Sequence, residues 1–166
     1  MTNEREKAAL REQAMTALVT ADYPFDVEAK LLRSVVVESS VMLDIGANTG
    51  VYSTIMEDLV GSQNLYIFEP LPHLYRLLKN RFENAHVFNF ALSDKEEKRN
   101  IRVPFIGGTR VDARATFNAH TESNQTGTDE VAVQLFSLDS FAKKARFESI
   151  GLIKIDVEGH ELEVLN

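Results

Sequence analysis

The chain has 166 residues, of which 44% are hydrophobic, and this is enough for one domain around a single core. Its net charge of -7 would repel a polyanion, and no stripe of Lys and Arg with interleaved aromatic residues predicts a nucleic-acid partner. The chain has no cysteine, which excludes disulfide bonds and thiolate zinc sites. No signal peptide and no apolar run of membrane-spanning length is evident, so we expect a cytoplasmic protein without a membrane partner.

The first 40 residues are predicted to be a helical segment that precedes the main domain. Residues 4–20 carry apolar side chains at helical spacing among charges, and Pro24 separates them from a second helical stretch at 27–37. We therefore divide the chain into an N-terminal helical segment, 1–40, and a main domain, 41–166.

Two strand-loop-helix units open the main domain. A strand at 41–43 ends in Asp44, a glycine-bearing loop follows at 46–50, and the next helix ends at Gly61. A second strand at 65–68 ends in Glu69 and Pro70, and a helix can begin at Pro72. A third strand is predicted at 87–90 with its exit at 91–94, and the charged run at 94–99 is interpreted as a solvated turn. The segments 101–106 and 130–136 are predicted to form a hairpin, and we interpret its long tip at 107–129 as disordered rather than as a lid. A helix at 137–147 and a strand at 152–155 follow.

Strands that alternate with helices imply parallel pairing and right-handed crossovers. We therefore expect a doubly wound α/β fold with a mostly parallel, Rossmann-like sheet and a β-hairpin insertion.

The polar residues of the main domain follow the ends of these strands. They are Asp44 with its glycine loop, Glu69, Ser93 with Asp94, and Asp156. Each of them alone is equally compatible with a turn or a helix cap. Together they predict a ligand site, because ligands of open α/β sheets bind beyond the carboxyl ends of the strands.

The loop after the first strand helps to choose among adenosine ligands. Its spacing is Gly-x-x-x-Gly, whereas a dinucleotide site needs Gly-x-Gly-x-x-Gly to bring backbone amides to a pyrophosphate. Asp44 would repel a pyrophosphate and attract an ammonium or sulfonium group. Glu69 can accept hydrogen bonds from both hydroxyls of a ribose. These features favour S-adenosylmethionine.

The same residues resemble a known family. The run VMLDIGANTG at 41–50 is similar to the first donor-binding motif of class I methyltransferases, with Asn48 where many members have a glycine. The run IFEP at 67–70 resembles the ribose-binding strand end of that class. The runs ALSD at 91–94, SLDSF at 137–141 and especially IKIDVEGHE at 153–161 resemble blocks of the FkbM-type O-methyltransferases.

This resemblance implies a donor, an acceptor and a set of site residues. The acceptor would be a hydroxyl group on a sugar or another small molecule. The catalytic candidates are Asp156, Glu158 and His160, and His160 has the ordinary pKa best suited to a proton acceptor. The implied donor-binding residues are Asp44, Gly46, Ala47, Asn48, Gly50, Glu69, Pro70, Ser93 near the adenine, and Asp156.

Other interpretations of the same residues stay open. The acidic cluster at 156–161 could hold magnesium or manganese, but acidic residues at a helix start also complement the helix dipole, and we expect no metal. His73, His86 and His120 have no evident partner and are interpreted as structural or exposed. The whole chain could instead be a noncatalytic adenosine-ligand module or a nicotinamide-dependent oxidoreductase.

The resemblance also implies seven strands, and no strand pattern follows Asp156. We therefore expect a C-terminally incomplete sheet in which the strand at 152–155 is an open edge. Lys154 is the only charged residue of that strand that would guard the edge against pairing with another chain. Such an edge would pair into a homo-oligomer or aggregate, and turnover would be weak without the remaining segment.

Overall fold

The computed structural model describes Leu32, Ser34 and residues 40–119 and 121–166. The helix expected at 4–20 lies outside the described residues. The helix expected at 27–37 is described only at Leu32 and Ser34, and both are helical.

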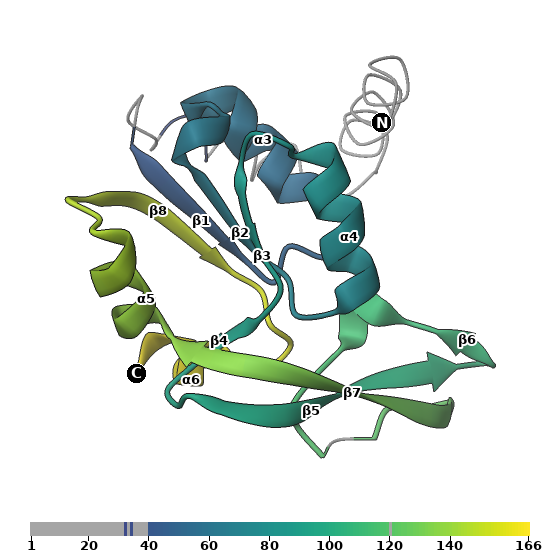
Figure 1. The fold of residues 1–166 in the computed structure, drawn as a ribbon. Coiled ribbons are helices and arrows are strands. Elements are labelled where there is room, and N and C mark those ends of the chain that lie inside the picture. Colours follow the sequence, from purple (N-terminus) through teal and green to yellow (C-terminus); the bar gives the residue numbers. More distant parts are fainter. Residues whose placement is uncertain (1–31, 33, 35–39, 120) are drawn as a thin grey trace.

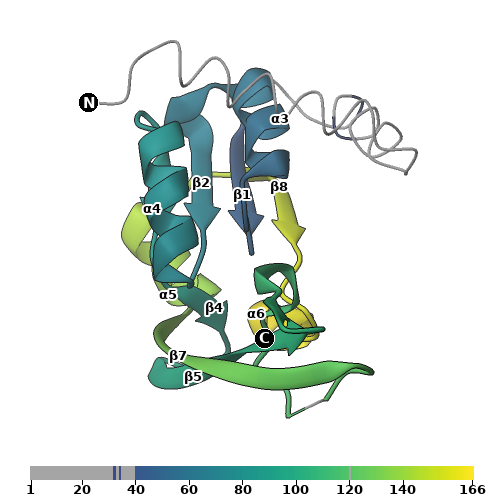
Figure 2. The ribbon, with the colours of Figure 1, turned by 90° about the vertical axis from the view of Figure 1, so that its right-hand side faces the viewer.

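A parallel four-stranded sheet forms the centre of the fold (Figure 1). Its strands are β1 (Val41–Ile45), β2 (Leu65–Phe68), β3 (His86–Phe88) and β8 (Ile150–Ile155), in the order β3-β2-β1-β8. All neighbouring pairs are parallel, so the carboxyl ends of β1, β2 and β8 point the same way, as Figure 2 shows. The predicted mixed α/β, Rossmann-like class is therefore confirmed.

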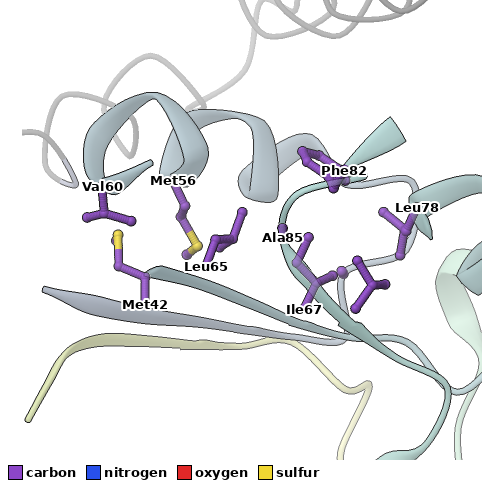
Figure 3. Close-up of a cluster of buried hydrophobic side chains, with 10 residues drawn as sticks. Met42, Met56, Val60, Leu65, Ile67, Leu78, Phe82 and Ala85 are labelled. Atoms are coloured by element: carbon purple, nitrogen blue, oxygen red, sulfur yellow. The ribbon is translucent and has the colours of Figure 1, made fainter. Parts of the chain in front are cut away.

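Helices α3 (Val51–Val60) and α4 (Pro72–Arg81) pack on one face of this sheet (Figure 1). The side chains of Met42, Leu65 and Ile67 meet Met56 and Leu78 there in a fully buried cluster, which Figure 3 shows. Strand residues that alternate between the two faces supply the apolar side chains of this layer. The predicted start and end of α3 and the predicted start of α4 are correct to within a residue.

Helix α5 (Leu138–Ala145) covers the opposite face. It begins one residue after the predicted start at 137 and ends two residues before the predicted end at 147, because Arg146 leaves the helical conformation with φ 56°. The Ser137 hydroxyl accepts a hydrogen bond from the Ser140 amide at 3.2 Å and caps the first turn. Phe141 then reaches into an aromatic cluster, with ring centroids 5.0 Å from Phe68 and 4.9 Å from Phe88. These edge-to-face contacts fix α5 on the sheet.

A second sheet crosses beyond the carboxyl ends of the parallel strands (Figure 2). Its order is β4-β7-β5-β6, from strands β4 (Ala91–Ser93), β5 (Glu97–Ile106), β6 (Thr109–Arg110) and β7 (Gln125–Ser137). Strands β5 and β7 pair antiparallel, which confirms the predicted hairpin insertion, and β4 runs parallel to β7.

Three local predictions in this region are wrong. The third strand ends at Phe88 rather than residue 90, because the side-chain amide of Asn89 turns to donate from Nδ2 to the Glu69 and Pro70 carbonyls at 3.0 and 2.9 Å. The expected solvated turn at 94–99 already belongs to β5 from Glu97 onward. The expected disordered tip at 107–129 instead contains β6, a 3-10 turn at Asp112–Arg114 and the first residues of β7.

The end of the described chain is a short helix, α6 (Glu161–Leu165), which follows β8. It lies against the second sheet near β4 (Figure 2). Among the helices that the structure describes, none has the length and apolar character needed to cross a lipid bilayer.

Candidate functional site

The loop after β1 passes very close to the ends of both neighbouring strands. The amides of Gly46 and Ala47 donate to the Phe68 carbonyl at the end of β2, at 3.0 and 3.2 Å. Gly46 has φ +77°, and a Cβ atom added to it would lie 2.0 Å from the Asp156 carbonyl oxygen beyond β8. Only glycine fits this position, because the conformation and the available space both exclude a side chain.

Glu69 follows β2 and is only 4% exposed. Its Oε2 accepts a hydrogen bond from the Asn48 amide and its Oε1 accepts one from the Leu71 amide, both at 2.8 Å. Burial raises the pKa of this carboxyl to about 7 despite these two bonds, and the nearby carboxylates of Asp44 and Asp112 also raise it. Glu69 therefore titrates near neutral pH.

A pocket opens where the parallel strands end against the second sheet. It encloses about 620 Å³ of space, including the part open to solvent, which lies within the range of small-molecule sites. Of the residues predicted from the sequence, the pocket is lined by Gly46, Asn48, Glu69, Pro70, Asp156, Glu158 and His160.

The other predicted residues lie outside the pocket lining. Asp44 is fully buried behind the loop, where it accepts a hydrogen bond from the Ser53 hydroxyl at 2.5 Å. A Cβ atom on Gly50 would lie 2.6 Å from Leu78 and 2.8 Å from Phe82, so this glycine lets α4 pack against the start of α3. Ala47 is also buried behind the lining.

The second sheet supplies a pocket wall that the sequence analysis missed. Strands β4 and β5 contribute Ala91, Leu92 and Ile101 to this wall, and the segments before β4 and after β6 contribute Phe90, Asp112, Ala113, Ala115 and Phe117. The segment from Val111 to Asn118 is held in place by the Thr116 hydroxyl, which donates to the Glu158 carbonyl at 2.7 Å. The alternation of Ala115 and Phe117 was a signal for this wall, because residues two apart in an extended segment share a face.

Asp112 joins this wall to α4. Its Oδ2 lies 2.8 Å from His73 Nε2, and its Oδ1 accepts a hydrogen bond from Arg110 at the same distance. Hydrogen bonds from Arg110 and His73 outweigh partial burial and lower the pKa of this carboxyl. His73 therefore has the partner that the sequence did not reveal, and His86 stacks on Tyr66 with centroids 4.4 Å apart. The third such histidine, His120, lies outside the described residues.

His160 precedes α6 and is 3% exposed, although it also lines the pocket. Its Nε2 lies 2.9 Å from the Ser93 hydroxyl, which donates to Asp94 at 3.1 Å. The Ser93 hydroxyl can accept from a protonated Nε2 or donate to an unprotonated one, so this contact fixes the orientation of the ring and leaves its tautomer open. Burial lowers the pKa of His160, so the ring is neutral at neutral pH and one of its two nitrogens carries a free electron pair.

The two acidic catalytic candidates lie beside His160 at the pocket mouth. Asp156 and Glu158 are both exposed lining residues, and Glu158 has φ 52°. Partial burial and the neighbouring carboxylates of Asp156 and Glu161 raise the pKa of Glu158. The Glu161 carboxylate turns away to accept from the Val157 and Gly159 amides, both at 3.2 Å.

Comparison with known proteins decides the family. The model of the methyltransferase FkbM domain matches residues 44–166, which is most of the chain and includes every residue of the pocket. The chain belongs to the FkbM methyltransferase family. A curated relative, the hexuronic acid methyltransferase AglP of Haloferax volcanii, is 26% identical over 140 residues. This alignment covers 82% of the chain and 53% of AglP, so the chain spans about half the length of that relative. No solved structure matches the chain.

Proposed function

We propose that this chain binds S-adenosylmethionine in the pocket at the ends of β1, β2 and β8, as the donor part of a methyl transfer to a hydroxyl group. The observation that carries the proposal is the buried Glu69 carboxylate, which lies beside the Gly46–Asn48 backbone in a pocket of suitable size. Membership of the FkbM family supports the reaction type.

The residues of the pocket fit the donor. Each oxygen of Glu69 accepts one backbone amide and keeps a further acceptor site, so the carboxylate can receive the two hydroxyl protons of a ribose. Leu71, Phe90 and Leu92 give the adjacent wall an apolar surface for a base. The bound donor supplies a methyl group that its sulfonium already activates, so the protein has only to orient the acceptor and take its proton.

His160 is the residue that we propose takes this proton. In this proposal Ser93 accepts from Nε2–H, which leaves Nδ1 as the basic atom. Glu163 Oε2 lies 3.6 Å from Nδ1 and stabilises the imidazolium once the proton has moved. Ser93 thereby has a role in orienting the ring, and its position near the adenine, which the resemblance implies, stays a prediction.

The acceptor that we propose is a hydroxyl group on a sugar or a similar small molecule. Support comes from AglP, which is named as a hexuronic acid methyltransferase. The cytoplasmic location and the pairing of copies through the β8 edge both stay predictions.

Calorimetry with S-adenosylhomocysteine, S-adenosylmethionine and NAD tests the donor assignment. We expect both methionine-derived ligands to bind and NAD not to bind, because the loop lacks the spacing of a pyrophosphate site. Tight binding of NAD, without binding of either methionine-derived ligand, would instead favour an oxidoreductase. Binding of the donor without turnover on any hydroxyl acceptor would favour a noncatalytic module.

The His160→Gln variant tests the proton acceptor in a separate assay. We expect it to keep its affinity for S-adenosylhomocysteine and to lose about 100-fold or more of its turnover, as is typical for loss of a general base. Turnover is measured as release of S-adenosylhomocysteine in a screen of sugar acceptors. Full activity of the folded variant would remove His160 from the reaction.

A further inference from the structure

Lys154, in the middle of the edge strand β8, faces into the protein. Its side chain is 15% exposed, and its Nζ donates to the Gly46 carbonyl at 3.0 Å. The same ammonium lies 3.3 Å from Asp44 Oδ1, 3.6 Å from Asp156 Oδ2 and 5.1 Å from the centroid of the Tyr52 ring. The expectation that Lys154 guards an open edge against pairing is therefore wrong.

These contacts join the two sides of the pocket. Gly46 and Asp156 both line it, one on the loop after β1 and the other after β8, and Lys154 contacts both. Asp44 and Lys154 are paired across the two strands by register, so the contact is built into the sheet. Asp44 is fully buried and needs a positive partner, because an unpaired buried carboxylate is costly.

We propose that Lys154 is a positioning residue of the donor pocket, which fixes the Gly46 carbonyl and neutralises Asp44. The inference rests on the proposed donor. Its consequence concerns charge: since Lys154 balances Asp44 behind the loop, the pair gives the pocket little net attraction for a cationic ligand. The negative charge of Asp44 is therefore not what selects a sulfonium compound, contrary to the expectation from the sequence.

The test compares a cationic ligand with a nearly identical ligand that lacks the sulfonium charge. S-adenosylmethionine and S-adenosylhomocysteine differ by one methyl group and that charge, and calorimetry gives the affinity of each. In the Lys154→Met variant the Gly46 carbonyl loses its donor, and we expect affinity for S-adenosylhomocysteine to fall about tenfold. Asp44 is then unbalanced, and we expect the preference for S-adenosylmethionine over S-adenosylhomocysteine to rise about fourfold.

Two further variants separate charge from general damage. Lys154→Arg keeps the positive charge and should keep the wild-type ligand preference. Lys143→Met removes a lysine from the exposed surface of α5 and should change neither affinity. An equal loss of affinity for both ligands in Lys154→Met, with an unchanged preference between them, would mean that Lys154 only supports the fold. Unchanged affinities in that variant would equally overturn the proposal.

A double variant covers the case in which Lys154→Met does not fold. Asp44→Asn with Lys154→Met removes both charges, and replacing a buried pair as a whole is far less disruptive than removing one partner. We expect it to fold, to bind S-adenosylhomocysteine about tenfold more weakly, and to show the wild-type preference between the ligands. Wild-type affinity in the double variant would refute the positioning role. A wild-type protein that binds neither ligand would refute the proposed donor itself.

Discussion

Ionisation of Glu69 should control donor binding near neutral pH. The carboxyl is buried and accepts hydrogen bonds from the Asn48 and Leu71 amides, yet its pKa is raised to about 7. Hydroxyl groups of a ribose bind a carboxylate about twice as strongly as a neutral acid. The donor should therefore prefer the ionised form, and protonation of Glu69 below pH 7 should oppose binding.

The size of the effect follows from this pKa. With a pKa of about 7, about one-tenth of the molecules carry ionised Glu69 at pH 6 and about nine-tenths do so at pH 8. If binding requires the ionised form, affinity for S-adenosylhomocysteine falls about tenfold from pH 8 to pH 6, equivalent to about 1.4 kcal/mol. The same linkage requires that binding at pH 6 releases close to one proton, and close to none at pH 8.

Calorimetry in two buffers of different ionisation enthalpy measures both quantities. The Glu69→Gln variant cannot ionise, so its affinity should be weaker at pH 8 and should lose this pH dependence. His160→Gln is the matched control, because His160 also lines the pocket and has a lowered pKa. It should keep the pH dependence of the wild type. A slope that survives in Glu69→Gln, or disappears in His160→Gln, would refute the assignment to Glu69.

Three predictions concern stability. The folded pKa of Glu69 lies above its ordinary value of 4.5, so its stabilising contribution is complete below pH 4.5 and is lost as pH rises through 7. The free energy of unfolding from chemical denaturation should fall by about 3 kcal/mol over this range in wild type, and this fall should be absent in Glu69→Gln. Gly46→Ala should lower the free energy of unfolding by more than about 2 kcal/mol and abolish binding of S-adenosylhomocysteine. The control Gly107→Ala has a similarly positive φ with open space around it, and it should cost about 1 kcal/mol. Equal losses of stability in the two variants would mean that the contact with Asp156 is unimportant. Phe141→Ala should lower the free energy of unfolding by about 3 kcal/mol, because it removes a ring from the aromatic cluster between α5 and the sheet. The control Leu77→Ala changes a side chain that is 41% exposed and should cost less than about 1 kcal/mol. Similar unfolding midpoints in urea for the two variants would contradict this prediction.

The parallel sheet could be predicted because its signals are local. Strand β2 is a continuous apolar run and β1 is one apart from Asp44, and a glycine or proline marks where each adjoining helix begins or ends. The carboxyl ends of these strands then place Glu69 and Asp156 at one edge without any knowledge of side-chain contacts. That reasoning correctly anticipated where the pocket lies, and it needed only the chain order of the elements.

The second sheet could not be predicted to the same extent, because tertiary contacts shape it. Nothing in the sequence near Asn89 indicates that its side-chain amide donates to the Glu69 and Pro70 carbonyls after β2. That contact nevertheless ends β3 and directs the chain toward β4. The segment around Thr116 is polar and reads as a mobile tip. It is ordered by hydrogen bonds from Thr116 and Asn118 to carbonyls after β8, which are 42 and 41 positions away in the chain.

The contrast between Glu69 and Asp44 shows why strand-end position alone does not assign a role. Both are acidic residues at the ends of neighbouring strands, and both are almost fully buried. The Glu69 carboxylate accepts from two backbone amides among the described residues and lines the pocket, so its remaining acceptor sites can serve a ligand. Asp44 lies opposite Lys154 in the register of β1 with β8, and that pairing turns its charge inward. Register between segments 110 residues apart is set by the packing of the whole sheet, and it decides which carboxylate can face a donor.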